Sequence, residues 1–127
     1  MWSKPFAFVA VRHSRYTYEF MEKFNTFTLT AFPDEYQEAL KLLGSRSGRD
    51  GDKITAAGLT PESSIQVAAP SFEEAEIVFE CQKIYADDLN PAHFLDDDIY
   101  KHYPNHDFHR IYYGEILSVA GIDKYQQ

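Results

Sequence analysis

Cationic and hydroxyl side chains gather at two places in the first half of the chain. The segment RHSRYT supplies Arg12, Ser14, Arg15 and Thr17, and it follows an apolar run that predicts a strand. A helix beginning in this segment would add free backbone amides, and together these donors suit an anion such as a phosphate. The same residues also fit an ordinary helix cap flanked by two solvated arginines, so both interpretations stay open.

The second place is the segment SRSGRDGDK, residues 45–53. Its potential donors to a phosphate or to the polar rim of a ring are Ser45, Ser47, Arg46, Arg49 and Lys53. Gly48 would allow the backbone to approach a ligand closely. Asp50 and Asp52 could instead neutralise the cations and cap the next helix, so the segment is either a ligand-binding loop or a solvated turn.

Three histidines, His102, His106 and His109, occur in the segment HYPNHDFH. Pro104 opposes the helical i, i+4 presentation that a two-histidine metal site would use, and no cysteine is near, so we expect no metal site. Each histidine remains a possible hydrogen-bond donor to a ligand.

Other catalytic signatures have no local support in this chain. The sequence contains no Gly-x-Ser-x-Gly elbow, Walker loop or dinucleotide fingerprint. The single cysteine, Cys81, lies on the apolar side of an alternating segment and is expected to be a buried hydrophobic residue. The two anion-site candidates are therefore the chemistry that the residues themselves suggest.

Composition narrows the class of partner. The chain has 127 residues and a formal charge of −8, with eight Lys/Arg against seven Asp/Glu up to residue 53 and four against thirteen beyond it. An acidic chain repels polyanions, so we expect no nucleic-acid partner, although the near-neutral first part could accept a small anion. A lone cysteine, no signal peptide and no long apolar run predict a cytoplasmic protein without a membrane span.

Alternating and apolar runs predict the elements that would position these residues. We expect strands at 5–12, 26–32, 72–85 and 108–122, helices after residue 14 or 17, at 33–44 and at 51–57, and an irregular excursion over 86–107. Strands without strict alternation with helices favour a single mainly β domain, residues 1–127, built as an antiparallel barrel or sandwich with helices outside.

Taken in order, four segments resemble the flavin reductase-like, flavoredoxin-type family of FMN-binding split barrels. They are WSKPFAFVAVRHSRYTYEFMEKFNTFTLTAF, SRSGRDGDK, FEEAEIVFECQKIYADDL and HRIYYGEI, and the resemblance runs from Trp2 to about Leu117. It implies a split antiparallel β-barrel with outer helices, working as a homodimer that binds FMN near the subunit interface. It also implies a section before Trp2 that holds further barrel strands, so we expect an N-terminally shortened barrel.

The resemblance also implies roles for individual residues. Arg12, Ser14, Arg15 and Thr17 would surround the FMN phosphate. Thr30, Ser47, Gly48 and Lys53 would lie near the flavin, and His109 beside the nicotinamide or substrate. Lys53 and His109 would be the catalytic candidates, because either could stabilise negative charge on the reduced ring.

Three functions remain open from the sequence. The first is hydride transfer from NAD(P)H to flavin by an FMN-dependent oxidoreductase. The second is a flavin-binding electron carrier that serves a downstream acceptor protein. The third is a truncated barrel that dimerises without binding flavin.

Overall fold

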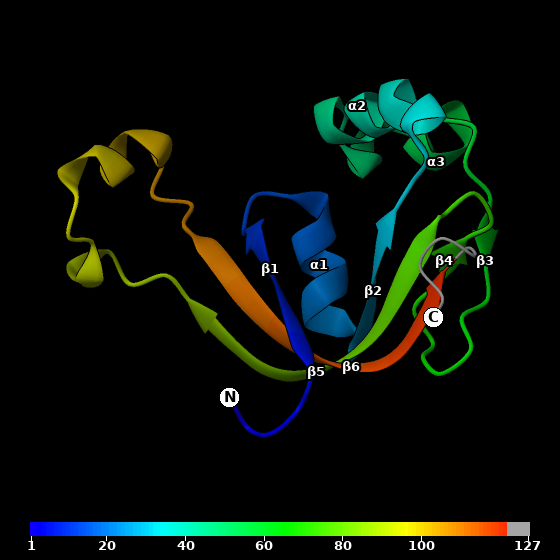
Figure 1. The fold of residues 1–127 in the computed structure, drawn as a ribbon. Helices are drawn as coiled ribbons and strands as arrows, with labels where there is room; N and C mark the ends of the chain where they lie inside the picture. The colour runs from blue at the N-terminus through cyan, green and yellow to red at the C-terminus, as the bar shows by residue number, and fades with distance from the viewer. Residues whose placement is uncertain (122–127) are drawn as a thin grey trace.

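A four-stranded antiparallel sheet forms the centre of the computed structural model, which describes residues 1–121 apart from the side chain of Asp50. Its strands are β1 (Phe6–Arg12), β2 (Thr26–Ala31), β5 (Ile77–Asp88) and β6 (His109–Gly121), in the order β1-β6-β5-β2. Two short strands, β3 (Pro61–Glu62) and β4 (Ser71–Phe72), pair separately. Figure 1 shows β5 and β6 curling so strongly that the sheet forms an open half-barrel, which is the mainly β arrangement that the sequence predicts.

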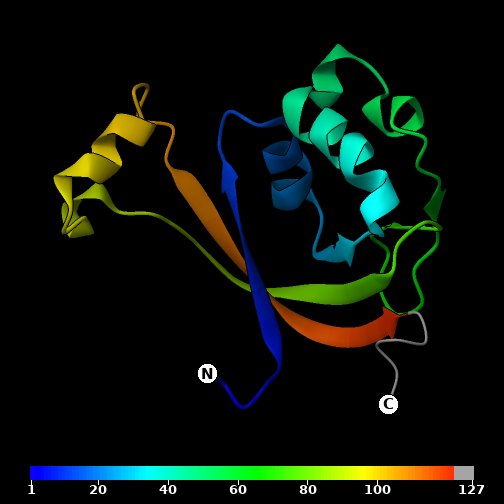
Figure 2. The ribbon, with the colours of Figure 1, turned by 45° about the horizontal axis from the view of Figure 1, so that its top comes forward.

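Helices connect the strands on the hollow side of the sheet and beyond its end. They are α1 (Tyr16–Lys23), α2 (Gln37–Ser45) and α3 (Lys53–Ala56), with 3-10 turns η1 (Asp34–Tyr36) and η2 (Gly48–Asp50) around α2. In Figures 1 and 2, α1 lies within the curl of the sheet, and α2 and α3 lie beyond the end of β2. This arrangement brings the start of α1 towards the loop that follows α2.

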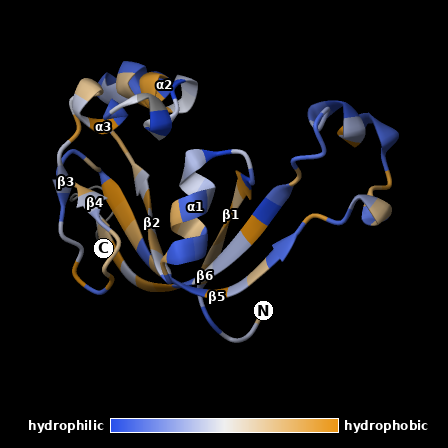
Figure 3. Cartoon of the chain, turned by 180° about the vertical axis from the view of Figure 1, so that it is seen from behind, coloured by the Kyte–Doolittle hydropathy of each residue, from blue (hydrophilic) through white to orange (hydrophobic). Residues whose placement is uncertain are grey.

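The segment between β5 and β6 projects away from the rest of the molecule (Figures 1 and 2). This arm, residues 89–108, contains two 3-10 turns, η3 (Pro91–His93) and η4 (Asp97–His102). Most of the residues of the arm are hydrophilic (Figure 3). The sequence predicts an irregular excursion here, and the arm agrees with that prediction.

The core lies between α1 and the hollow face of the sheet. Met21 from α1 packs with Phe27, Cys81 and Tyr112 from three strands, and Cys81 and Tyr112 are completely buried. Burial raises the pKa of the Cys81 thiol to about 11, so the group stays protonated and unreactive at neutral pH. The expectation that Cys81 is a buried hydrophobic residue is therefore confirmed.

The opposite face of β1 and β6 carries an exposed aromatic surface, which consists of Trp2, Phe6, Phe8, Tyr85 and Tyr113. The Tyr113 ring lies 5.6 to 6.0 Å from the rings of the other four. Phe8 is 63% exposed, because β1 is an edge strand of this sheet and its residues alternate between the two faces. Large rings thus face solvent on a sheet that buries its other side.

The polar side of β5 is not open to solvent at Glu80. Glu80 is only 2% exposed, and its carboxylate accepts hydrogen bonds from the backbone amides of Ile65, Gln66 and Val67. The connection between β3 and β4 therefore covers this face of the sheet. Three backbone amides donate hydrogen bonds to the buried carboxylate, and these bonds offset the free-energy cost of removing its charge from water.

Element boundaries differ from the sequence prediction in two places. The strand expected from residue 72 begins at Ile77, because the chain turns at Glu73 and donates that residue's amide to the carbonyl of Thr60. The cap of α1 is Arg15, without a side-chain cap bond, so neither Ser14 nor Thr17 caps this helix. Asp52 does cap α3, as predicted. Residue 122, the expected end of the last strand, lies outside the described residues.

Across the described residues, no helix combines the length and the apolar character needed to cross a bilayer.

Candidate functional site

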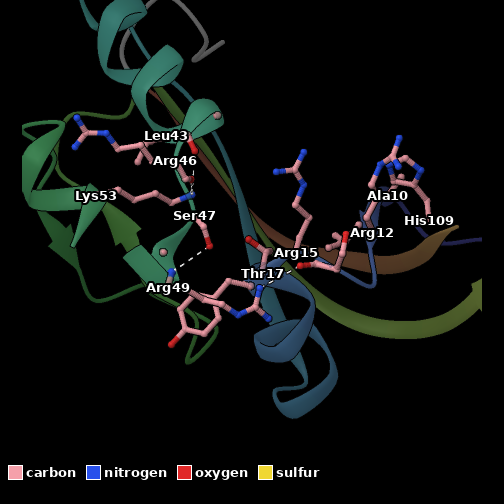
Figure 4. Close-up of a pocket in the computed structure, with 15 residues that line it drawn as sticks. Ala10, Arg12, Arg15, Thr17, Leu43, Arg46, Ser47, Arg49, Lys53 and His109 are labelled. Carbon is pink, nitrogen blue, oxygen red and sulfur yellow. Dashed lines mark hydrogen bonds between the residues drawn. The ribbon is translucent and has the colours of Figure 1, made fainter. Parts of the chain in front are cut away.

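A cavity of about 470 Å³ lies between the β1–α1 turn and the loop that follows α2 (Figure 4). It is lined by eight of the nine residues to which the family resemblance assigns a role: Arg12, Ser14, Arg15, Thr17, Ser47, Gly48, Lys53 and His109. The two segments with cationic and hydroxyl side chains therefore face one another across a single space. The fold brings them together because α1 crosses the hollow of the sheet and α2 returns the chain above it.

Thr30 does not line this cavity. Thr30 lies on β2 and pairs with Val78 of β5. Its neighbour Leu29 points to the other face of the sheet and packs against the core. Thr30 therefore shares a face with Thr28, whose hydroxyl donates to the carbonyl of Pro70 at 2.7 Å. The structure places this predicted residue with the covered polar side of the sheet, apart from the other eight.

Five cationic side chains line the cavity, and three of them are held by protein groups. Lys53 Nζ donates to the carbonyl oxygens of Leu43 and Arg46 at 2.9 and 3.0 Å, so it caps the end of α2. Arg49 donates to the carbonyl of Ser14 at 3.1 Å, which ties the two walls of the cavity to each other. The third, Arg12, is bound by the arm.

Arg15 and Arg46 are the remaining cations of the cavity. Within the part of the chain that the structure describes, neither guanidinium makes a hydrogen bond or an ion pair. Figure 4 shows Arg15 extending into the space between Lys53 and Ser47 on one side and Arg12 on the other. The first backbone amides of α1 also lack partners within their helix. The cavity thus presents unpaired positive charge and free donors, which suits an anion.

Asp107, which the sequence did not indicate as a site residue, forms hydrogen bonds with two of the residues predicted to bind an anion. Its carboxylate accepts from Ser14 Oγ at 2.8 Å and from Arg12 Nη1 at 3.3 Å. The hydrogen bond from Ser14, together with the charge of Arg12, holds the pKa of Asp107 below its usual range. The only signal in the sequence was its position two residues before the last strand, because the register pairs Arg12 with His109.

Gly48 is required by the packing of the loop. A Cβ atom at this position would lie 2.7 Å from Cδ2 of Tyr16, at the start of α1. The Ser47 hydroxyl accepts from the backbone amide of Arg49 at 3.1 Å and caps η2. Close backbone approach, which the sequence predicts at Gly48, therefore occurs against a side chain of the protein itself.

His109 begins β6 and reaches the cavity beside Arg12. Its Nδ1 lies 2.5 Å from the hydroxyl of Tyr103. Partial burial lowers the pKa of His109, and the positive charges of Arg12 and Arg15 lower it further. The imidazole is therefore neutral at pH 7, with one ring nitrogen that donates and one that accepts.

No group of three or more His, Cys, Asp and Glu side chains among the described residues is arranged to hold a metal ion.

Comparisons with known proteins give the same picture of the fold. Flavoredoxin of Desulfovibrio vulgaris (Miyazaki F) superposes with a TM-score of 0.72 at 23% identity, over 94% of this chain and 55% of that chain. An FMN-binding protein from Thermus thermophilus, with bound p-hydroxybenzaldehyde, gives 0.71 at 21% identity, over 94% and 57%. A protein from Shewanella frigidimarina described as a flavin reductase with a split barrel domain gives 0.75 at 20% identity, over 98% and 55%.

The chain spans about half the length of these structures. An uncharacterized protein of Aquifex aeolicus is 30% identical over 97 residues, which are 76% of this chain and 41% of that protein. These likenesses confirm the split-barrel fold predicted from the sequence. Residues 3–126 match the profile described as flavin reductase like domain, and the chain belongs to this family.

Proposed function

We propose that this chain binds FMN with its phosphate in the cationic cavity and transfers a hydride from NAD(P)H to the flavin. The observation that carries the proposal is the guanidinium of Arg15, which extends into the cavity and pairs with no protein anion among the described residues (Figure 4). Membership of the flavin reductase like family supports a flavin as the ligand. The FMN-binding Thermus protein of the same fold supports FMN in particular.

The residues present fit such a group. A cavity of about 470 Å³ has the size of ordinary small-molecule sites. Arg15, the hydroxyl of Thr17 and the first amides of α1 offer charge, hydroxyl and backbone donors to one phosphate. FMN carries a phosphate dianion, and this match of charge distinguishes it from riboflavin.

When bound, the flavin would supply the redox chemistry, accepting a hydride from NAD(P)H and a proton from solvent to give reduced flavin and NAD(P)⁺. The chain would supply orientation and charge. Lys53 Nζ uses two of its three donors on backbone carbonyls, which fixes the ammonium at the cavity wall with one donor left for a ligand. His109 would meet the nicotinamide or substrate.

A flavin-binding electron carrier is the second candidate, and the likeness to a flavoredoxin favours it. Such a protein would hold FMN and pass electrons to an acceptor protein, with little oxidation of NAD(P)H. We also propose that the chain forms homodimers through the aromatic surface, because solvent-exposed rings gathered on one sheet face mark interaction sites.

Titration of FMN and of riboflavin against the full chain tests the proposal. We expect FMN fluorescence to change on binding and riboflavin to bind about tenfold or more weakly, because it lacks the phosphate that Arg15 would meet. Anaerobic mixing of the loaded protein with NADH or NADPH then separates a reductase, which consumes the nicotinamide, from a carrier, which does not. Absence of FMN binding at any concentration would rule out both functions.

The variant Arg15→Ala should weaken FMN binding about 10- to 100-fold, the usual effect of losing a charge-assisted hydrogen bond. Lys41→Ala is the matched control, because Lys41 lies exposed on α2, pairs with Glu38 at 3.2 Å and does not line the cavity. Riboflavin affinity should be nearly unchanged in both variants. Equal FMN affinity of Arg15→Ala and the control would remove Arg15 from the phosphate site.

A further inference from the structure

Tyr103 of the arm and His109 of β6 form a buried contact at the edge of the cavity. The Tyr103 hydroxyl lies 2.5 Å from His109 Nδ1, and the two rings meet edge to face with their centroids 5.5 Å apart. Tyr103 is only 8% exposed, although most of the arm faces solvent. A buried tyrosine that bonds a cavity-lining histidine can control that histidine's protons.

The direction of this hydrogen bond follows from the other groups around it. Among the described residues, the Tyr103 hydroxyl has no other polar partner, and neither has His109 Nε2. If Nδ1 carried the proton, the hydroxyl hydrogen of a buried tyrosine would have no acceptor, which is costly. Donation from Tyr103 to Nδ1 satisfies the hydroxyl and leaves the imidazole proton on Nε2.

Arg12 holds Tyr103 in this position. Its guanidinium lies 4.8 Å from the centre of the Tyr103 ring, a cation–π contact, and its Nη2 donates to the adjacent carbonyl of His102 at 2.8 Å. The charged groups that act on His109 are Arg12 of β1, Arg15 at the start of α1 and Asp107 of the arm. Partial burial favours the neutral ring, and the two cations outweigh the one carboxylate, so the balance of these effects lowers the pKa of His109.

We infer that Tyr103 is a positioning residue that fixes His109 as the neutral Nε2–H tautomer, so that His109 presents a hydrogen-bond donor to the ligand in the cavity. The ligand atom that meets His109 is then an acceptor, such as a carbonyl oxygen or an anionic oxygen. The carboxamide oxygen of a nicotinamide belongs to this class. The identity of the ligand rests on the proposed function, whereas the tautomer does not.

The tautomer is measured directly by nitrogen-15 NMR of the histidine side chains in the ligand-free protein. His109→Gln identifies the His109 signals. We expect Nδ1 of His109 to show the shift of an unprotonated nitrogen and Nε2 that of a protonated one at pH 7. A proton on Nδ1 would overturn the inference, whatever the protein binds.

The variant Tyr103→Phe tests the cause. A bond donated to Nδ1 exists only in the neutral ring, so it lowers the pKa of His109, and its loss should raise that pKa by about half to one unit. The tautomer preference should also weaken. Tyr100→Phe is the control, because it removes a hydroxyl from the same arm, where Tyr100 donates to the carbonyl of Pro91 at 2.8 Å. Identical His109 titrations in both variants would refute the role of Tyr103.

The consequence for ligand recognition is tested by His109→Gln and His109→Leu. Gln keeps an amide donor, whereas Leu does not, so we expect affinity for NAD(P)H to fall about 2- to 10-fold more in the Leu variant. Equal losses in the two variants would show that the donor is not used. If FMN binding fails altogether while the NMR result holds, the proposed function falls and the tautomer assignment stands.

Discussion

At the scale of single residues, Asp107 acts as an anion supplied by the protein itself. It accepts from Arg12 and Ser14, two groups that the sequence assigns to the FMN phosphate. A phosphate that used these donors would have to displace the carboxylate or share them with it. We therefore expect Asp107 to lower the affinity of the cavity for anions, and Arg15 is left as the cation that a phosphate could meet without this competition.

Replacing Asp107 with Asn tests this competition. Removal of the negative charge should strengthen FMN binding about 2- to 5-fold in fluorescence titrations, with little change for riboflavin, because exposed charge pairs contribute modestly. Asp97→Asn changes the same charge elsewhere on the arm and should have no effect. Weaker FMN binding by Asp107→Asn would show instead that Asp107 organises the site.

Most of the candidate site could be predicted from the sequence, since donors clustered in two segments are visible without a fold. The position of Thr30 outside the cavity could not be predicted, because a strand pattern does not reveal which of its two faces the rest of the chain covers. Asp107 and Tyr103 could not be found, because the sheet register alone brings the arm to Arg12. Whether the gathered residues bind FMN remains a prediction.

At the scale of elements, β6 depends on the absence of a side chain at Gly114. A Cβ atom there would lie 2.6 Å from Cζ of Phe27 and 2.9 Å from Cβ of Cys81, both in the core. The pairing with β5 also shifts by one residue beside Gly114, where Lys83 and then Tyr85 face successive residues of β6. A larger residue is therefore excluded at this position, which lies beside an irregularity in the pairing of the two strands.

The variant Gly114→Ala should lower the free energy of unfolding by about 1–3 kcal/mol, the usual cost of overpacking a core. Gly44→Ala is the matched control, because nothing lies within 4 Å of its Cβ position and it sits within α2. That change should stabilise the protein by roughly 0.5–1 kcal/mol through helix propensity. Urea denaturation of both variants measures the difference, and a neutral Gly114→Ala would mean that the Phe27 ring can move aside.

Strands could be predicted where a run of apolar or alternating residues was long, as for β1, β2 and β6. The expected strand at 72–85 began five residues late, because alternation in sequence does not reveal that Glu73 bonds to Thr60. Similarly, the alternating pattern of this strand does not reveal that Glu80 is buried, because the path of residues 61–70 covers it. Local pattern fixes the tendency of a segment, and contacts between distant segments decide its ends and its environment.

At the scale of the whole molecule, the two faces of the sheet differ in their exposure to solvent. One face is buried under α1, and the other exposes the aromatic surface around Tyr113. Exposed rings of this kind favour association over a free monomer. The proposed homodimer would bury them.

The variant Phe8→Glu should shift the chain from dimer towards monomer in sedimentation velocity experiments, because it places a charge within the aromatic surface. Phe8 is already 63% exposed, so its replacement should leave the fold intact by circular dichroism. Leu95→Glu, at a fully exposed position on the arm, is the control and should not alter association. A wild-type protein that is monomeric at all concentrations would exclude the dimer.

The pairing of β1 with β6 also has a consequence for synthesis on the ribosome. Phe6 pairs with Glu115 and Arg12 with His109, so β1, the earliest of the four strands of this sheet to be made, needs the latest of the four as its partner. At about 5–20 residues per second, β1 waits roughly 5–20 seconds before β6 is translated. During that interval Phe6, Phe8, Val9 and Val11 form an apolar stretch without a sheet to join. The nascent chain therefore presents a binding segment for chaperones that the finished protein conceals only in part.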